Sequence, residues 1–136
     1  MTISESIIKW LYEHNIEIER IDTGILPSKT LSYALAKVPT SVVETYLDGS
    51  QRRTEYYSFL ARRPSQFDPE RVSNDKFFED LENQVDDLNF SGDLPELDGN
   101  RICEEISVSS SFYLYEASES ESVYSLTFEI IYRKER

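Results

Sequence analysis

The chain has 136 residues, of which 26 are acidic and 14 are basic, so its formal net charge at pH 7 is −12. A chain of this length is typical of one domain, and 39% apolar residues are enough for one hydrophobic core. The acidic balance argues against a protein that binds DNA through its phosphates or is attracted to anionic lipids, because both need a basic surface. We therefore expect a single domain over residues 1–136, without specific DNA binding and without a membrane partner.

The single cysteine and the composition of the N-terminal segment indicate the compartment in which the protein is made. Cys103 is the only cysteine, so it has no partner for an internal disulfide. The segment from Met1 to Ile8 lacks the basic stretch and the long apolar run of a secretion signal. No segment approaches the roughly 20 apolar residues of a membrane span. These features predict synthesis in the cytoplasm.

The first part of the sequence predicts a helix followed by a short strand. Thr2 and Glu5 have the spacing of a capping box, and apolar residues recur behind them every three or four positions, which predicts an amphipathic helix over residues 3–14. Apolar and acidic residues then alternate over residues 16–21, a pattern typical of a half-buried strand. Residues 25–30 are expected to form a loop.

The next segment predicts strands and a hairpin. The apolar run over residues 31–38 is expected to stop at Pro39, because proline cannot donate to a strand ladder. Residues 42–47 and 53–61 are rich in β-branched and aromatic side chains, and Asp48-Gly49 lies between them. This arrangement predicts a β-hairpin with a loop of two residues or more.

A change of period after Pro64 predicts a second helix, over residues 73–89. Apolar residues recur there at helical spacing while acids occupy the other faces. Asp68-Pro69 is expected to form a separate short turn, with Ser73 as a second candidate for the N-cap. Gly92 lies where a helix stop is expected, and residues 91–100 are expected to connect the helix to the next strand.

The last third predicts a second hairpin, with strands over residues 102–114 and 124–132 and a turn at 117–122. In the first of these strands the apolar residues share one parity: Ile102, Ile106, Val108, Phe112 and Leu114. Cys103 falls on the other, polar parity, which is expected to face water. The element order predicts an α+β fold in which two helices cover a largely antiparallel or mixed sheet.

The sequence offers little material for catalysis. His14 ends the first predicted helix, where a cation is favoured by the helix dipole. A Cys103 nucleophile would need a base within hydrogen-bond reach, and His14 is the only histidine. A small hydrolase that uses this pair stays as an alternative, but we expect no enzyme and no catalytic residues.

Ligand patterns for metals and cofactors are also missing from the sequence. One cysteine and one histidine are too few for a structural zinc site, and the acidic runs lack the alternating ligands and central glycine of a calcium loop. The four glycines are isolated from one another, so no phosphate-binding loop is predicted. We therefore expect no metal and no cofactor.

Basic residues form three clusters at predicted strand ends: Arg52-Arg53, Arg62-Arg63 and Arg133-Lys134-Glu135-Arg136. In an acidic chain they suggest opposed faces that pair between copies, although charges that keep strand ends soluble explain them equally well. Several of the nine tyrosines fall in predicted strands. Tyrosine is enriched at protein interfaces and is also a good strand former.

Four segments together resemble a known family. They are Tyr46-Leu47-Asp48-Gly49-Ser50 before an aromatic strand, the helix Asp75 to Leu88 with Phe77-Phe78, Leu94-Pro95-Glu96-Leu97, and a closing hairpin with Tyr113-Leu114 that ends Ile130-Ile131-Tyr132. In order and spacing, over residues 40–133, they resemble the tail terminator proteins of long-tailed bacteriophages and prophages. This family is also called tail-completion or minor capsid proteins.

The resemblance implies a structural role at the head-tail junction of a virion that is assembled in a bacterial cytoplasm. Members of the family form a hexameric ring on the head-proximal end of the tail tube, stop its polymerisation and join it to the head connector or a head-completion protein. DNA passes through the ring. Acidic side chains along the channel would repel its phosphates over a screening length of roughly 8 Å, so that it slides without specific binding.

A closed ring needs two different contact patches on each subunit. One candidate is an exposed sheet edge or the loop from Asp48 to Arg53, where a neighbouring subunit or the tail tube protein would bind. The candidate residues are Tyr46, Asp48, Gly49, Ser50, Arg52 and Arg53. The alternative function is an acidic interaction protein whose helix over residues 73–89 imitates nucleic-acid charge and occupies a partner's binding site.

Overall fold

The computed structural model describes residues 1–14, 18, 20–28 and 30–136. Its elements in chain order are α1 (Ile3–Glu13), β1 (Ile21–Thr23), β2 (Ser32–Thr45), β3 (Gln51–Pro64), α2 (Asp68–Ser91), β4 (Arg101–Ala117) and β5 (Glu121–Lys134). The strands form one sheet in the order β1-β2-β3-β5-β4, in which β1 runs parallel to β2 and the other neighbours are antiparallel. The predicted α+β class, a mixed sheet covered by two helices, is confirmed.

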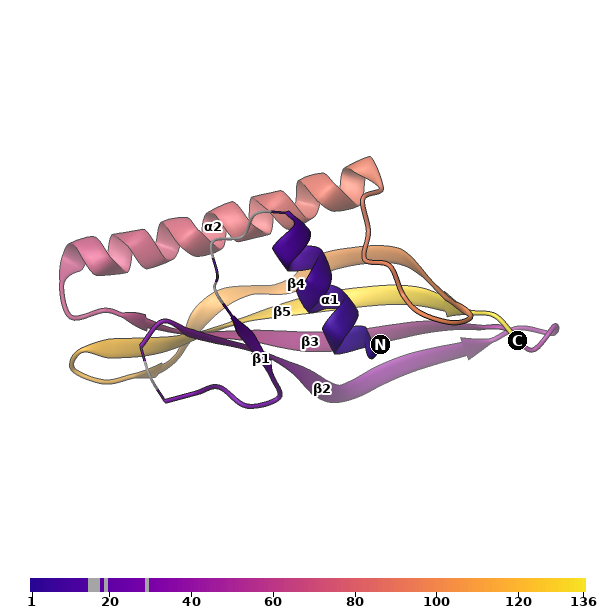
Figure 1. Cartoon of the computed structure of the whole chain (residues 1–136), viewed down its shortest axis with the longest axis horizontal. Coiled ribbons are helices and arrows are strands. Elements are labelled where there is room, and N and C mark those ends of the chain that lie inside the picture. Colours follow the sequence, from indigo (N-terminus) through magenta and orange to yellow (C-terminus); the bar gives the residue numbers. More distant parts are fainter. Residues whose placement is uncertain (15–17, 19, 29) are drawn as a thin grey trace.

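The molecule is elongated, and both helices lie on one side of the sheet (Figure 1). The β2–β3 hairpin projects at one end of the long axis, next to the C-terminus, and the β4–β5 hairpin projects at the other end. Most of the strand predicted over residues 16–21 lies outside the described residues, and β1 begins only at Ile21.

Helix α1 follows the sequence prediction closely. Both capping-box hydrogen bonds are present at 3.1 Å, one from Glu5 N–H to Thr2 Oγ1 and one from Thr2 N–H to the Glu5 carboxylate. The apolar stripe faces the core, where Ile7 and Leu11 are almost fully buried. The helix ends at Glu13, with the next residue as its C-cap.

Helix α2 is longer than the predicted 73–89. Pro69 occupies the first turn of the same helix, where its missing N–H would have no intrahelical partner in any case. The prediction of a separate turn at Asp68-Pro69 was therefore wrong. The predicted stop is confirmed, because Gly92 adopts the left-handed conformation with φ of 80°. On the buried side, the Phe78 ring stacks on Phe112 at 5.0 Å between centroids.

Strand β2 runs through Pro39 instead of stopping there. Its pairing with β3 holds up to Lys37, shifts register, and resumes at Ser41. The irregularity accommodates a residue without an N–H, as is typical of bulges and of strand edges. Since β1 pairs only with Tyr33 to Leu35, the rest of β2 is a sheet edge in the described structure.

Strand β4 departs from simple alternation. Its pairing with β5 shifts register four times, first between Cys103 and Glu105. Each extra residue changes which parity faces the helices. As a result Ile102 is 58% exposed, whereas Cys103 packs against the core. The expectation that Ile102 faces the core and Cys103 faces water was wrong for this reason.

Candidate interaction surface at the end of the sheet

The predicted hairpin at Asp48-Gly49 is confirmed, and the five residues from Tyr46 to Ser50 connect its strands. Tyr46 N–H donates to Ser50 O at 2.9 Å, and Gly49 N–H donates to Tyr46 O at 3.0 Å. Gly49 has a φ of +87°, as expected where a tight turn leads into a bulged hairpin. Leu47 stands at the tip, where its side chain is fully exposed.

Asp48 and Ser50 shape this loop from within. The Asp48 carboxylate accepts hydrogen bonds from the Ser50 hydroxyl at 2.6 Å and from the Ser50 N–H at 2.9 Å. These bonds lower the pKa of the Asp48 carboxyl below its usual range. Ser50 is itself buried, so it positions the loop, whereas Asp48 and Tyr46 remain exposed to a partner.

The C-terminal segment packs against the same loop. A Cβ placed on Gly49 would lie 2.5 Å from Arg136 Cδ, so the arginine stem covers the glycine. The Arg133 guanidinium lies 3.5 Å from Ser50 Oγ and 3.9 Å from the Asp48 carboxylate. Two basic clusters that are far apart in sequence therefore meet at one end of the sheet. We call this surface the basic end and define it by Arg52, Arg53, Arg133, Lys134 and Arg136.

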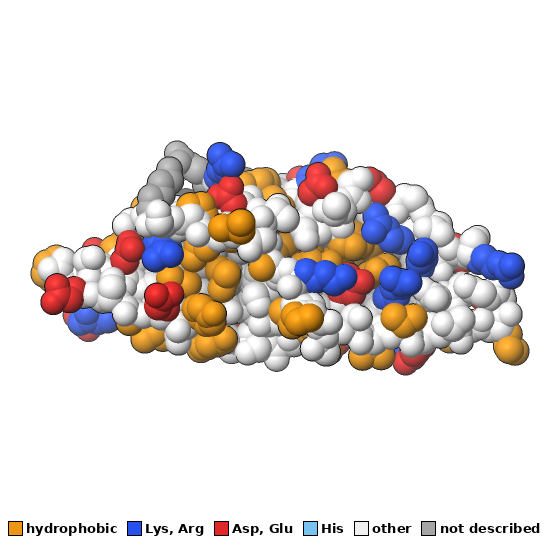
Figure 2. Space-filling view, turned by 90° about the horizontal axis from the view of Figure 1, so that it is seen from below, with side chains coloured by type: hydrophobic (Ala, Val, Ile, Leu, Met, Phe, Trp, Pro, Cys, Tyr) orange, Lys and Arg blue, Asp and Glu red, His pale blue; other side chains and the backbone are white. Residues whose placement is uncertain are grey.

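The third cluster has a different role, far from this surface. The Arg63 guanidinium donates to Asn74 Oδ1 and to the Tyr33 hydroxyl, both at 2.6 Å, and lies over the Phe77 ring. It thus joins α2 to β2 and β3. Figure 2 shows Lys and Arg side chains of the visible face gathered mainly toward one end of the long axis, with apolar side chains nearer the middle.

Within the basic end, three cations surround an open pocket of about 260 Å³, namely Arg53, Lys134 and Arg136. The Arg53 guanidinium is held by Gln51 Oε1 at 2.8 and 3.0 Å. In the described part of the chain none of the three cations forms a salt bridge. Glu135 also lines the pocket and pairs with Arg133, so the three unpaired cations leave the pocket positive and open to an acidic partner.

The other two arginines of the basic end are already paired. Arg52 binds Glu104 of β4 at 3.2 Å, and Arg133 binds Glu135 at 3.1 Å. Both pairs are substantially exposed, so each contributes little to stability. The sequence clusters identified the cations correctly, but only the fold separates the paired ones from the free ones.

A buried polar cluster beside this surface has no counterpart in the sequence analysis. The Glu55 carboxylate is 5% exposed and accepts hydrogen bonds from the Tyr57 hydroxyl at 3.0 Å and the Tyr132 hydroxyl at 2.9 Å. Lys37 lies 3.7 Å away at the edge. Burial and the neighbouring carboxylate raise the pKa values of both tyrosines. Both carboxylate oxygens have partners, so the cluster holds β3 and β5 together.

The two residues considered for catalysis have other partners. His14 binds Trp10 O at 2.9 Å and Asp93 Oδ2 at 2.8 Å, whereas the Cys103 thiol lies against Glu105 O at 3.7 Å. Burial raises the pKa of Cys103 to about 11, which keeps the thiol neutral at physiological pH. Neither set of contacts forms a nucleophile–base pair.

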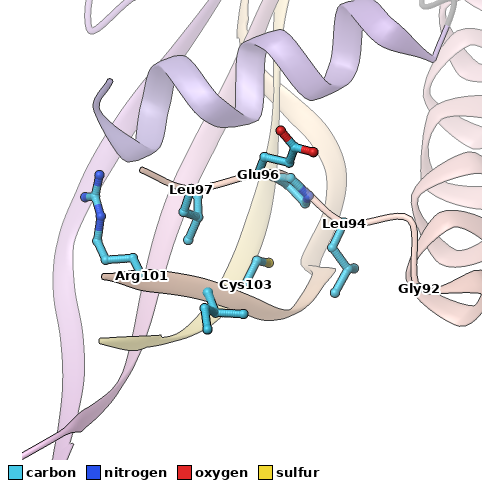
Figure 3. Close-up of a pocket in the computed structure, with 8 residues that line it drawn as sticks. Gly92, Leu94, Glu96, Leu97, Arg101 and Cys103 are labelled. Carbon is cyan, nitrogen blue, oxygen red and sulfur yellow. The ribbon is translucent and has the colours of Figure 1, made fainter. Parts of the chain in front are cut away.

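Cys103 lines a pocket of about 400 Å³ between β4 and the connector behind α2. Figure 3 shows Leu94 and Leu97 reaching from the connector toward the strand that carries Arg101 and Cys103. The lining is mostly apolar, with Glu96 and Arg101 as its charged members. Such a wall can bind apolar surface but offers no activated group for chemistry.

Among the described residues, no group of three or more His, Cys, Asp or Glu side chains is placed to hold a metal ion. Neither α1 nor α2 combines the length and the apolar character that a membrane crossing needs, as far as the chain is described. No protein-family model matches the chain, and no curated protein matches it either. Its function is therefore argued from the surface chemistry and from the ordered segments of the sequence.

Proposed function

We propose that this protein is a structural component of a phage virion that forms a ring, expected to be hexameric, at the head-proximal end of the tail tube. There it stops tube polymerisation and joins the tail to the head connector or to a head-completion protein. The observation that carries the proposal is the basic end, where three of five cations form no salt bridge within the described residues, on a chain whose net charge is −12.

Unpaired cations keep a strand end soluble, and in a protein that assembles they also offer a contact surface of opposite charge. Like-charged copies repel each other at long range, and a local surface of opposite sign guides them into one orientation. Tyr46 and Leu47, which are exposed beside the pocket, add apolar area that would be buried in a contact. Charge and apolar area together support a protein–protein contact at this end of the sheet.

The acidic remainder of the surface supports passage of DNA through such a ring. Outside α2 the chain still has 18 acidic and 12 basic residues, a net charge of −6. Acidic side chains that face a channel disfavour adhesion of phosphates within roughly 8 Å at physiological ionic strength. A ring of acidic subunits therefore suits a conduit that DNA crosses without stopping.

The decisive experiment combines the purified protein with polymerising tail tube protein from the same genome. We expect tubes to stop growing and to carry a ring at one end in electron micrographs, and the ring mass to be a small multiple of the chain mass. Leu47→Asp should reduce capping, whereas Ile25→Asp, at another exposed apolar residue, should leave it unchanged. Tubes that elongate at the same rate and carry no ring would overturn the proposal.

A second candidate is the acidic interaction protein, and the charge of α2 is the observation that favours it. A helix with exposed acids along much of its length can occupy a site meant for phosphates. In that case a DNA-binding protein from the host should bind the purified chain and be released by added DNA. Tube capping with no such partner would decide between the two candidates.

A further inference from the structure

The outer side of α2 carries a row of exposed acidic side chains. Beyond the first turn of the helix its exposed acids, which we call the acidic ridge, are Asp75, Glu79, Asp80, Asp86 and Asp87. Asp80 binds Lys76 at 2.6 Å, and the other four form no salt bridge within the described residues. The helix buries its opposite side, so the ridge points away from the sheet.

Apolar side chains stand among these acids. Phe90, one turn after Asp86 and Asp87, is 96% exposed, and Val72 near the start of the helix is 60% exposed. An aromatic ring in water next to unpaired charges is typical of a contact surface, where such residues contribute much of the binding energy. The second half of α2 therefore offers charge and apolar area together.

We propose that the acidic ridge of one copy, together with Phe90 at its C-terminal end, binds the basic end of a second copy. This inference rests on the proposed ring and names the two surfaces that would close it. Asp86 and Asp87 would approach the free cations of the pocket, while Phe90 would pack against the exposed apolar residues of the hairpin tip. Each surface supplies what the other lacks, namely opposite charge and apolar area.

The two surfaces cannot meet within one chain. Helix α2 lies over the sheet, whereas the β2–β3 hairpin extends beyond it along the long axis (Figure 1). A contact between different patches of identical subunits is heterologous, and it forms a closed ring if the rotation per subunit divides a full turn. Because each copy carries one ridge and one basic end, every copy in such a ring uses both.

The charged part of this contact is exposed to solvent before binding, so it responds to salt. The screening length falls from about 10 Å at 0.1 M to about 3 Å at 1 M ionic strength. We expect assembly to weaken as salt increases in this range. Phe90 makes the complementary contribution, because burial of an aromatic ring is not screened.

The test uses two variants of the full chain that neutralise one surface each. The basic-end variant is Arg53→Ser/Lys134→Ser/Arg136→Ser, and the ridge variant is Asp86→Asn/Asp87→Asn/Phe90→Ser. A charge control, Lys9→Ser/Arg20→Ser, removes exposed cations elsewhere. Mass distributions are measured by sedimentation velocity and native mass spectrometry, alone and on tail tubes, and thermal midpoints verify folding.

Wild type and the charge control should form rings, alone or on tubes, while each surface variant alone should not. An equimolar mixture of the two variants should give a heterodimer and nothing larger, because one intact ridge meets one intact basic end. Phe90→Ser by itself, at a nearly fully exposed side chain, should weaken assembly at least tenfold without a change in thermal midpoint.

Rings formed by either surface variant, or a mixture that stays monomeric, would overturn the inference while leaving the ring itself intact. A wild type that neither assembles nor caps tubes would overturn the proposed function. Duplex DNA serves as a further probe of the basic end. The inference is wrong if three results occur together: wild type binds duplex DNA, the basic-end variant does not bind it, and the ridge variant still forms rings. The pocket would then be a phosphate-binding site.

Discussion

The imidazole of His14, at the C-cap of α1, binds the carboxylate of Asp93, the second residue after α2, at 2.8 Å. The other ring nitrogen binds Trp10 O at 2.9 Å. A carbonyl and a carboxylate only accept hydrogen bonds, so both ring nitrogens must carry protons for both bonds to form. These contacts raise the pKa of His14, with the carbonyl contact as the largest cause and Asp93 as the next.

Protonated His14 should therefore stabilise the fold. A folded-state pKa above the unfolded value gives a contribution that is complete below about pH 6.5 and is lost as pH rises through the folded-state pKa. His14→Gln should lower the free energy of unfolding by about 1 kcal/mol at pH 5, a small value because Asp93 is largely exposed. The loss should be smaller at pH 8, where His14 is less protonated. Urea denaturation of wild type and variant at both pH values measures the difference. An equal loss of unfolding free energy at pH 5 and pH 8 would contradict a protonated His14 in the folded protein.

A second prediction concerns the buried carboxylate of Glu55. Glu55→Gln leaves one of the two tyrosine hydroxyls facing an amide group instead of an acceptor oxygen, which should cost about 1–3 kcal/mol of unfolding free energy. Glu44→Gln, at an exposed position of β2, should change it by less than about 0.5 kcal/mol. Equal effects of the two substitutions in chemical denaturation would mean that Glu55 is accessible to water.

The same cluster predicts behaviour at high pH. Burial, together with Glu55, raises the pKa values of Tyr57 and Tyr132, so stability is complete below about pH 10 and falls as pH rises through the folded-state values. Tyr57→Phe should remove part of this loss. An ultraviolet titration should show two tyrosines that ionise at a higher pH in the folded protein than in the unfolded chain, and ionisation at the same pH in both states would contradict the prediction.

Local patterns predicted most elements because each depends on a few neighbouring residues. The capping box at Thr2 and the stop at Gly92 are of this kind, and both are confirmed. The register shifts in β4 are different, since a bulge depends on how β4 pairs with β5, and alternation read from one strand cannot show it. Cys103 was placed on the wrong face for that reason.

The candidate surface was predictable only in part. Arg52 and Arg53 stand in the sequence beside the hairpin loop, so the loop itself was found. That Arg136 covers Gly49 depends on the last strand returning to this end of the sheet. Long-range pairing also decides which cations are free, because the partner of Arg52 is Glu104, which lies on β4.

Contact between the C-terminus and the hairpin can be tested at glycine. Gly49 and Gly92 both have a left-handed φ, of +87° and +80°, but an added Cβ at Gly49 meets Arg136 whereas at Gly92 it meets open space. Gly92→Ala should cost about 1 kcal/mol from backbone strain alone. Gly49→Ala should lower the free energy of unfolding by more, because the Arg136 side chain must also move away from the added Cβ. When Arg136→Ala is combined with each glycine substitution, both should lower the free energy of unfolding by the same amount. A remaining difference would show that another contact constrains Gly49.

The last prediction separates the two sides of α2 by a pair of aromatic substitutions. Phe78 is fully buried against Phe112 and Tyr124, so Phe78→Ala should lower the free energy of unfolding by about 3–5 kcal/mol. Phe90 is 96% exposed, so Phe90→Ala should change it by less than about 0.5 kcal/mol in the isolated chain. Urea denaturation at low protein concentration measures both values. If Phe90→Ala leaves the unfolding free energy of the monomer unchanged, any loss of assembly in this variant must come from a contact with another molecule. A large loss of monomer stability in Phe90→Ala would instead show that this ring packs within its own chain, and it would remove Phe90 from the proposed contact between copies.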